Sequence, residues 1–562
     1  FMADLPPAPD SLFLGSTAEK VQYFESDMGV GSNNWAVAGS KTQSGYPILA
    51  GDPHLSLSMP SIWMELQLHA PGYNVYGVAF QGIPGILIGF NEHLAFTETN
   101  VGSDVLDWYE IKFKDETKDE YWYNEKWHPT TKRIEEIKVR GGESIIDTLV
   151  FTHHGPVMQV FAGDSASEPV YHAMRWIAHE AGNSLKTFIG LNRARNYEEY
   201  REALKNYIAP AQNFLVATRE GDIGITVNGQ FPNKWEYQGR TVSDGSDPAY
   251  DWQGWIPNEH NPSMKNPERG FVSSANQASA GVDYPYYLGE DFAPYERSRR
   301  INDLLREMDN ITPQDMMRMQ MDNYSLHAES ILPDLLAWTI PDSLDTNELE
   351  VFEEMFLWDF GMDAGVIQPS VFYWWWRTFY RDMVSDEQAA SGVSLRNPPR
   401  DRLIEIIKGD PEFFLIDNVE TEEKESIRDL ATSSYKKAIE TMINYYGADL
   451  EKWDWGIVMN NNIDHIGQIP GLSVNDVYSG GSSEVINATR FGYGPSWRMV
   501  VELGPEIKGW GVYPGGITGN PGSPNYDAFI DNWRKGEHFK LNFYRDKPDD
   551  FNYLISLSPK EQ

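Results

Sequence analysis

Ser32 is the residue in this chain whose surroundings most clearly favour chemistry. It follows Gly31 and opens the run SNNWAVAG, which a polar turn separates from a second apolar run, PILAG. This pattern predicts two short strands that start at a serine. If the bond before Ser32 is cut, the residue carries a hydroxyl nucleophile together with an α-amine. The reference pKa of such an amine, about 7.7–8.0, suits a general base near neutral pH.

Two asparagines end strand-like runs and could donate hydrogen bonds to the oxyanion of an acyl-transfer reaction. Asn276 follows FVSS and offers its side-chain amide, whereas Asn100, in TETN, offers its main-chain N–H. Each could instead cap its own turn. His54, in DPHL, could hold the hydroxyl or the amine of Ser32, or it could be an ordinary buried histidine.

Other residues suit binding more than catalysis. Asp104 and Asp107, in SDVLD, flank the carbonyl of Leu106, and such oxygen ligands suit Ca²⁺, although a D-x-x-D motif alone is usually a solvated turn. Leu55 and Ile88 form an aliphatic pair that could line a pocket for an apolar acyl group or belong to the core.

Several long segments resemble the β-chain of the penicillin acylase family of N-terminal-nucleophile hydrolases. Besides the run from Gly31 to DPHL, they include WQGWIPNEHNPSMKNPERGFVSSANQ and GGITGNPGSPNYDAFIDNWRKGE, and they occur in the family's order. The resemblance implies an α+β fold, namely a four-layer αββα sandwich with a large helical insertion. It also implies that residues 1–31 are a spacer or propeptide tail and that self-cleavage at Gly31–Ser32 makes Ser32 N-terminal.

The resemblance assigns roles to the candidate catalytic residues. Asn100 and Asn276 match the oxyanion hole, and Asn100 stands where a relative often has alanine, a change that leaves a main-chain donor intact. His54 matches a supporting position near the nucleophile. Leu55 and Ile88 lie near the expected acyl pocket.

An arginine near the active site is also implied by the resemblance. Arg297, in YERSRR, matches it and would position Asn276 or the terminal amine. The neighbouring Arg299 and Arg300 leave this register open.

A structural Ca²⁺ site follows from the same resemblance. Asp104, Leu106 and Asp107 match the family's calcium loop, and Pro232 would add a carbonyl oxygen. Asp283 could complete the set, although its spacing departs from the family's pattern. A further ligand would come from a separate α-chain.

The expected function is therefore that of an acylase. It would hydrolyse the linear amide of an N-acylated small molecule, of penicillin or N-acyl-homoserine-lactone type, through an acyl-Ser32 intermediate. The resemblance adds an α-chain as heterodimer partner, a periplasmic or secreted location and no organic cofactor. The alternative is an inactive or unprocessed relative that acts as a binding or scaffold protein.

Two other hydrolase classes lack their motifs. The S-x-x-K and K-T-G set of β-lactam-ring hydrolases is not found, and neither is the H-E-x-x-H of zinc hydrolases. The pair His153–His154 has no ligand companion nearby in the sequence.

Composition limits the partners further. The 562 residues carry a net charge of -37, which argues against nucleic acid and anionic membranes. Cysteine is absent, so disulfides and thiolate metal sites are excluded. No apolar run approaches the ~18 residues of a membrane span, and no signal peptide is visible at Phe1.

The elements that must position these residues change along the chain. Short β-like runs dominate residues 32–295, the first part of the core, with helical periodicity at 184–208. Residues 296–470 are mainly helical, and Thr312-Pro313 followed by Asp315 predicts a helix start. The aromatic run 372–376 favours a buried helix face over sugar stacking. Residues 471–562 return to the core sheets.

Overall fold

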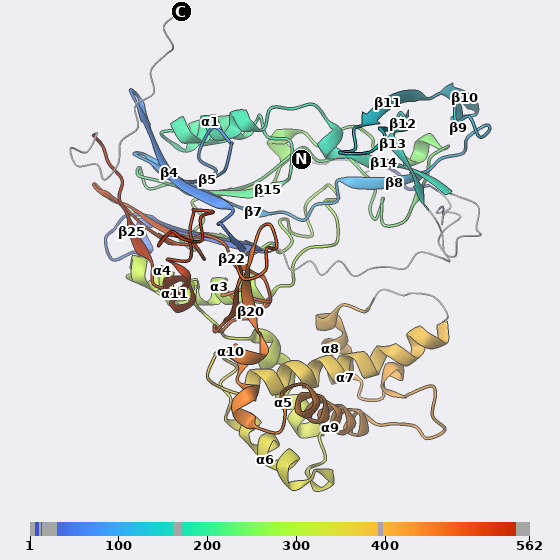
Figure 1. The fold of residues 1–562 in the computed structure, drawn as a ribbon, viewed down its shortest axis with the longest axis vertical. Coiled ribbons are helices and arrows are strands. Elements are labelled where there is room, and N and C mark those ends of the chain that lie inside the picture. The colour runs from blue at the N-terminus through green and yellow to red at the C-terminus, as the bar shows by residue number, and fades with distance from the viewer. Residues whose placement is uncertain (1–5, 10–12, 14–30, 161–169, 392–396, 547–562) are drawn as a thin grey trace, which may run out of the picture.

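The protein combines several sheets with a separate group of helices (Figure 1). This computed structural model describes residues 6–9, 13, 31–160, 170–391 and 397–546, so most of the predicted spacer 1–31 lies outside the described residues. Within the described ranges, no helix is both long enough and apolar enough to cross a membrane.

The sheet that carries Ser32 is built from both ends of the chain. Strand β1 lies between β19 and β2, and every residue of β1 is buried. The order along the sheet is β19-β1-β2-β23-β24-β25, and β22 pairs with β2. The strands are β1 (Ser32–Val37), β2 (Ile48–Ser56), β19 (Phe271–Ser274), β22 (Tyr493–Pro495), β23 (Arg498–Leu503), β24 (Ile507–Val512) and β25 (Phe539–Leu541).

A second sheet packs against the first. Its order is β18-β16-β15-β7-β6-β5-β4, so consecutive strands from β4 to β7 form a meander. The strands are β4 (Trp63–Ala70), β5 (Tyr73–Phe80), β6 (Ile88–Asn91), β7 (Leu94–Asn100), β15 (Gln212–Thr218), β16 (Ile223–Asn228) and β18 (Ser263–Lys265).

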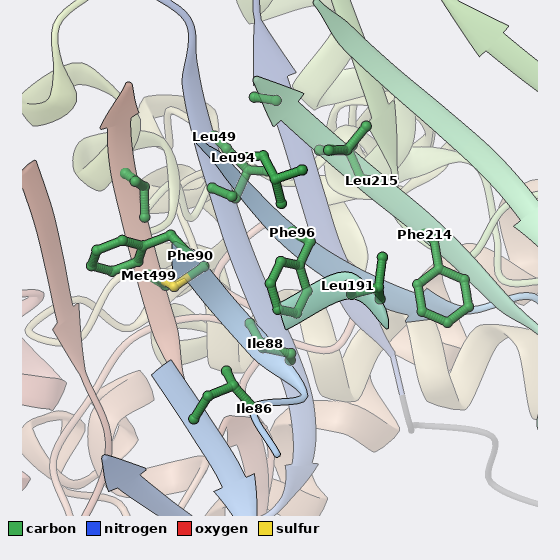
Figure 2. Packing of buried hydrophobic residues seen from close by; sticks show 14 of the residues in the cluster. Leu49, Ile86, Ile88, Phe90, Leu94, Phe96, Leu191, Phe214, Leu215 and Met499 are labelled. Carbon is green, nitrogen blue, oxygen red and sulfur yellow. The ribbon is translucent and has the colours of Figure 1, made fainter. Parts of the chain in front are cut away.

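The main core joins these two sheets to helices α1 (Leu185–Arg193) and α2 (Tyr197–Leu204) (Figure 2). Successive strand residues point to opposite faces. Phe214 therefore packs on Phe188 and Tyr207 beside the helices, while Leu215 faces the other way. Leu49 and Met499 bring side chains of the first sheet into the same core.

The other face of the first sheet is covered by α3 (Glu296–Glu307) and α4 (Pro313–Met319). Trp35 and Ile48 from the sheet pack with Ile301 and Met316 from these helices, and all four side chains are buried. Helix α4 begins with the predicted cap, because Thr312 and Asp315 form a capping box.

A third sheet contains β8 and the strands from β11 to β14 together with a short later strand. Its order is β11-β12-β13-β14-β8-β17. The strands are β8 (Leu106–Glu110), β11 (Thr131–Ile137), β12 (Ile145–Thr152), β13 (Gly155–Val160), β14 (Val170–Trp176) and β17 (Ser243–Asp244). A smaller sheet pairs β9 (Glu120–Tyr123) with β10 (Lys126–Pro129). In another, β20 (Asn461–His465) lies between β21 (Val474–Val477) and β3 (Ser58–Met59).

Most of the remaining helices form their own core, away from the sheets in Figure 1. The aromatic run begins α7, where Phe372 and Trp375 are buried while Tyr373 is 39 % exposed. This supports a packed helix face. The helices are α5 (Leu326–Trp338), α6 (Thr346–Glu354), α7 (Gln368–Ser391), α8 (Arg400–Gly409), α9 (Ile427–Tyr446) and α10 (Trp455–Val458); α11 (Ile530–Lys535) returns to the sheets.

Candidate active site

Ser32 begins β1, which lies between β19 and β2 in the first sheet, and is 4 % exposed. The Ser32 hydroxyl donates a hydrogen bond to the Gly31 carbonyl oxygen over 2.6 Å. The main-chain N–H of His54 donates to the same oxygen over 3.0 Å. The hydroxyl thus lies beside the carbonyl of the bond that it is predicted to cut, and a second donor already contacts that oxygen.

Asn276 and Asn100, which are distant in the chain, meet beside Ser32. Asn276 follows β19 with φ of 66°, a left-handed conformation that asparagine tolerates better than most residues. Its Oδ1 accepts from the Ser32 N–H over 2.6 Å, and its Nδ2 donates to the Asn100 carbonyl oxygen over 2.9 Å. The fold therefore brings Asn276 to the main chain of the predicted nucleophile and Asn100 to the side chain of Asn276.

Arg297 joins these groups from the first turn of α3. Its Nη1 donates to the Ser32 carbonyl oxygen over 3.0 Å and to Asn33 Oδ1 over 2.8 Å. Its Nη2 donates to Asn276 Oδ1 over 3.1 Å. One guanidinium consequently fixes the nucleophile's strand and the side chain that holds the nucleophile's nitrogen.

The arginine register is clear in the structure. Arg299 is largely exposed and Arg300 pairs with Asp322, whereas Arg297 is buried. The start of α3 is anchored by Glu296, which is buried and forms an ion pair with Arg400 of α8.

The guanidinium of Arg297 is buried and packs closely against Gly31. Burial lowers its pKa to about 10, and the negative charge of Asp52 opposes this shift. A Cβ added to Gly31 would lie 2.8 Å from Nη2, so a side chain at position 31 would push the guanidinium aside.

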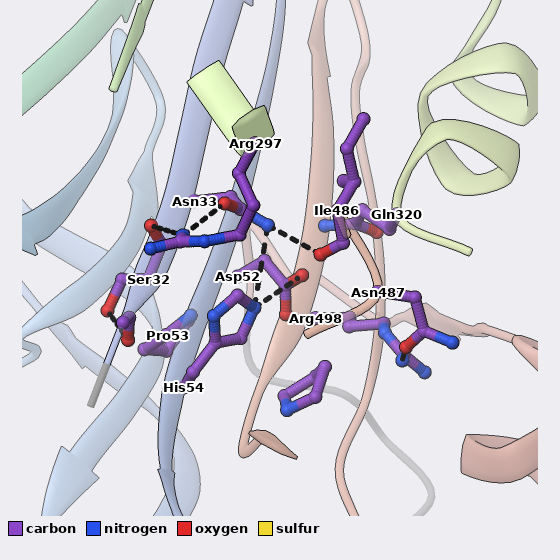
Figure 3. Close-up of polar contacts among 12 residues, drawn as sticks. Ser32, Asn33, Asp52, Pro53, His54, Arg297, Gln320, Ile486, Asn487 and Arg498 are labelled. Atoms are coloured by element: carbon purple, nitrogen blue, oxygen red, sulfur yellow. Dashed lines mark hydrogen bonds and ion pairs between the residues drawn. The ribbon is translucent and has the colours of Figure 1, made fainter. Parts of the chain in front are cut away.

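His54 faces Asp52 rather than the Ser32 hydroxyl (Figure 3). The two side chains occupy alternate positions of β2 and share a face of the sheet, and His54 Nε2 lies 3.1 Å from Asp52 Oδ2. Burial lowers the pKa of His54, and Asp52 opposes this shift. The ring also lies 3.5 Å from the side chain of Asn33. His54 therefore supports β1 through Asn33, the residue that follows Ser32.

Asp52 and Arg498 belong to this buried network, although sequence reasoning named neither. Arg498, on β23, donates to Asn487 Oδ1 over 2.7 Å and to the Trp533 carbonyl oxygen over 2.8 Å. Burial lowers the pKa of Arg498 to about 10, and Asp52 opposes this shift. The alternation of Asp52 and His54 in GDPHL was the one sequence feature that could have revealed Asp52.

A cavity of about 700 Å³ opens beside Asn100 and Asn276. Its wall is mainly apolar and includes Val105, Trp176, Ile177, Ile208, Phe292 and Pro294. Sequence reasoning missed these residues, because they come from separate segments of the chain with no shared motif.

The two residues expected to line the acyl pocket lie in the core. Ile88 on β6 is 1 % exposed, and the partly buried Leu55 on β2 packs against the same core. Neither is part of the wall of the cavity beside Asn276.

The carboxylates of Asp104 and Asp107, which were expected to bind Ca²⁺, form ion pairs with the side chain of Lys234. Lys234 Nζ lies 2.7 Å from Asp104 Oδ2 and 2.8 Å from Asp107 Oδ1, and Lys234 is 1 % exposed. Trp252 Nε1 donates to the other Asp107 oxygen over 2.6 Å. Gly239 allows this close packing, since a Cβ there would lie 2.0 Å from Asp107 Oδ1.

The other expected calcium ligands serve different contacts. Leu106 begins β8 and pairs with Trp176 of β14, and Pro232 forms an isolated β-bridge with Trp255. Asp283 is exposed. Ca²⁺ takes six to eight oxygen ligands, so the arrangement around Lys234 fits an ammonium group and does not fit this ion.

Comparisons with known proteins show which family the chain resembles. A model of the penicillin amidase family matches residues 2–549. The acyl-homoserine lactone acylase QuiP of Pseudomonas aeruginosa is 28 % identical over 94 % of this chain and 69 % of its own length. The penicillin acylase 2 proenzyme of Pseudomonas sp. strain SE83 is 29 % identical over 70 % of this chain and 49 % of its own length.

This chain therefore spans about two thirds of the first relative and about half of the second. Among solved structures, the thermostable penicillin G acylase from Alcaligenes faecalis superimposes with a TM-score of 0.72 over 94 % of this chain and 100 % of that one, at 18 % identity. Its fold is thus shared with this chain. Because the family match extends over almost the entire sequence, the chain belongs to the penicillin amidase family.

Proposed function

We propose that this protein hydrolyses the linear amide bond of N-acylated small molecules through an acyl-Ser32 ester. The observation that carries the proposal is the 2.6 Å contact between the Ser32 nitrogen and Asn276 Oδ1, with Arg297 bound to both residues. This contact holds the atom that would become the α-amine of the nucleophile. No observation on the described residues favours an inactive scaffold protein.

Maturation would begin at the Gly31–Ser32 bond. The Ser32 oxygen attacks the Gly31 carbonyl carbon, the peptide bond rearranges to an ester, and the nitrogen of Ser32 becomes a free amine. Water then hydrolyses the ester and releases Gly31 as a carboxylate. The His54 N–H, at 3.0 Å from the Gly31 oxygen, would stabilise the negative charge on this oxygen during the attack.

In the mature protein the α-amine would act as the general base. Asn276 Oδ1 would accept one N–H of the amine, which leaves its lone pair free to take the proton of the Ser32 hydroxyl directly or through one water. The nearby cation of Arg297 disfavours the protonated amine and so lowers its pKa. This effect raises the fraction of neutral base near pH 7, whereas the hydrogen bond accepted by Asn276 Oδ1 favours the protonated amine.

The oxyanion would be stabilised by Asn276 and Asn100. The amide group of Asn276 carries two hydrogens, and one of them is donated to the Asn100 carbonyl oxygen. The second would face the substrate oxyanion together with the main-chain N–H of Asn100.

The substrate class is an apolar acyl group joined to a polar amine. The cavity beside Asn276 has a mainly apolar wall and a volume of about 700 Å³. The names of the relatives, acyl-homoserine lactone acylase and penicillin acylase, indicate the same chemistry for those proteins.

Finer features extend the proposal. The succession of α1 and α2, the second sheet, the first sheet, and α3 and α4 supports the four-layer αββα arrangement of N-terminal-nucleophile hydrolases. A second chain that completes the site, export to the periplasm or the medium, and synthesis as a zymogen rest on the resemblance and stay predictions.

The test combines mass spectrometry with a substrate panel. Protein expressed from the full-length gene should be cut before Ser32 and should form an acyl adduct on that residue with p-nitroanilides of increasing acyl length. Ser32→Ala should remain uncut and inactive, whereas Ser56→Ala, a change at an exposed serine of β2, should behave like the parent. Cleavage of Ser32→Ala between residues 31 and 32, or turnover without an adduct on Ser32, would exclude the mechanism.

A further inference from the structure

A second group of chemistry-bearing residues lies in the third sheet, apart from the strands that carry Ser32. His153 and His154 form the two-residue turn between β12 and β13, where Thr152 pairs with Gly155. Asp251 follows a short 3-10 helix (Pro248–Tyr250). The histidine pair has no ligand companion nearby in the sequence, but folding brings Asp251 to it from a distant segment.

We propose that His153, His154 and Asp251 form a binding site for one transition-metal dication, best suited to Zn²⁺. His153 Nε2 lies 3.6 Å and His154 Nδ1 lies 3.7 Å from Asp251 Oδ1, and the three atoms lie within 4.8 Å of one another. These separations are too long for hydrogen bonds. They approach the roughly 3.3–3.5 Å between neighbouring ligands of a tetrahedral zinc ion, as follows from metal–ligand bonds of about 2.0–2.2 Å.

Hydrogen-bond partners around the three residues orient their ligand atoms toward the proposed metal position. His154 Nε2 lies 3.3 Å from the Gly245 carbonyl oxygen, which can only accept, so this nitrogen carries the hydrogen and Nδ1 presents its lone pair to Asp251. Asp251 Oδ1 is buried without a hydrogen-bond partner among the described residues. Two electron-pair donors that face one another repel unless a cation lies between them.

The polar atoms of His153 and Asp251 that would not bind the metal contact tyrosine hydroxyl groups. His153 Nδ1 lies 2.9 Å from Tyr121 Oη, and Tyr123 donates from its hydroxyl to Asp251 Oδ2. Tyr109 stacks on the ring of His154, with 3.9 Å between centroids. Ligands that are oriented by neighbouring acceptors and donors are typical of zinc sites in proteins.

The chemistry of the donors selects the metal. Two imidazoles and one carboxylate suit Zn²⁺ and its neighbours in the first transition row, whereas Ca²⁺ and Mg²⁺ prefer oxygen ligands alone. Three protein ligands leave one position for solvent. A bound ion would clamp the β12–β13 hairpin to the segment after Tyr250, and this role is independent of the proposed acylase activity.

Metal binding can be measured directly on the purified protein. After treatment with a chelator and dialysis, isothermal titration with Zn²⁺ should show one site per chain, and bound Co²⁺ should give the visible absorption of a tetrahedral complex. His153→Gln and Asp251→Asn should each weaken binding at least about 100-fold, and Tyr121→Phe about 10-fold, as expected for a ligand and for its orienting neighbour. Zn²⁺ should raise the unfolding temperature of the parent and not that of the ligand variants.

A matched control distinguishes this site from nonspecific binding of the metal by exposed histidines. His69 is exposed on β4, and His69→Gln should leave both the affinity and the stoichiometry unchanged. No binding of Zn²⁺ or Co²⁺ by the parent would overturn the proposal, as would equal binding by the parent and by a folded Asp251→Asn variant. Either result leaves the proposed acylase function intact, because that function is tested at Ser32.

Discussion

Replacement of Lys234 by methionine should destabilise the protein strongly while keeping most of the buried aliphatic stem. The ammonium group contacts Asp104 and Asp107 at 2.7 and 2.8 Å. At an effective dielectric constant of about 20, each contact contributes about 6 kcal/mol of attraction. Desolvation and repulsion between the carboxylates offset much of this, and removal of one partner from a buried ion pair generally costs about 3–5 kcal/mol. We expect a loss of that size in the free energy of unfolding.

Urea denaturation of the parent and of Lys234→Met at pH 7.5 measures this loss. Lys265→Met is the matched control, because Lys265 also contacts two carboxylates, Glu198 and Asp222, but is 37 % exposed. Such a surface network should contribute about 0–1 kcal/mol. The loss in Lys234→Met should shrink below about pH 6, since burial raises the pKa of Asp104 to about 6 and a protonated carboxyl no longer needs the cation.

Added Ca²⁺ distinguishes an ammonium site from a calcium site. We expect millimolar Ca²⁺ to leave the unfolding midpoint of the parent unchanged, because Lys234 already neutralises the carboxylates. A parent that Ca²⁺ stabilises, together with a Lys234→Met variant that loses less than about 1 kcal/mol, would refute the reasoning.

Three further predictions concern other parts of the chain. Asn276→Ala should fold and lower kcat by roughly 10²–10³ with little change in KM, and steady-state kinetics beside circular dichroism would show this; activity within a few-fold of the parent would remove Asn276 from the mechanism. Burial raises the pKa of Glu98 well above its usual value, so its contribution to stability is lost as pH rises through that pKa. Glu98→Gln should therefore gain stability relative to the parent as pH rises above the usual pKa of a glutamate, measured by thermal unfolding, and identical pH profiles would contradict this. Ile208→Trp should narrow the cavity and lower kcat/KM for long acyl chains roughly tenfold, since each buried CH₂ contributes about 0.8 kcal/mol; an unchanged preference for chain length would place the acyl site elsewhere.

Local patterns were enough to predict many elements and where they begin. Two apolar runs after Ser32, separated by a polar turn, predicted the first two strands, and Thr312 with Asp315 predicted the start of α4. Both signals depend on neighbours in the chain. The window 184–208, predicted to be helical, contains two helices. Asn196 caps the second helix by accepting from the Glu199 N–H, and this local bond interrupts the apolar periodicity.

The contacts of the candidate site could be predicted only in part from the sequence. The resemblance identified Ser32, Asn276 and Arg297 as candidates, and the fold brings them into contact. The partnership of Lys234 with Asp107 could not be predicted, because nothing in either local sequence marks the other and only the packing of the third sheet joins them. The cavity wall is likewise a product of tertiary structure.

The contact between Gly31 and Arg297 joins a residue that would depart at maturation to one that would stay. A larger residue at position 31 would collide with a guanidinium that also holds Ser32 and Asn276, so it would slow the cleavage that creates the nucleophile. Mature molecules would carry no trace of that change, because residue 31 leaves with the spacer. A substitution at position 31 would therefore change the rate of self-cleavage and leave the kcat of the mature enzyme unchanged. A substitution in the cavity wall would change kcat and leave the rate of self-cleavage unchanged.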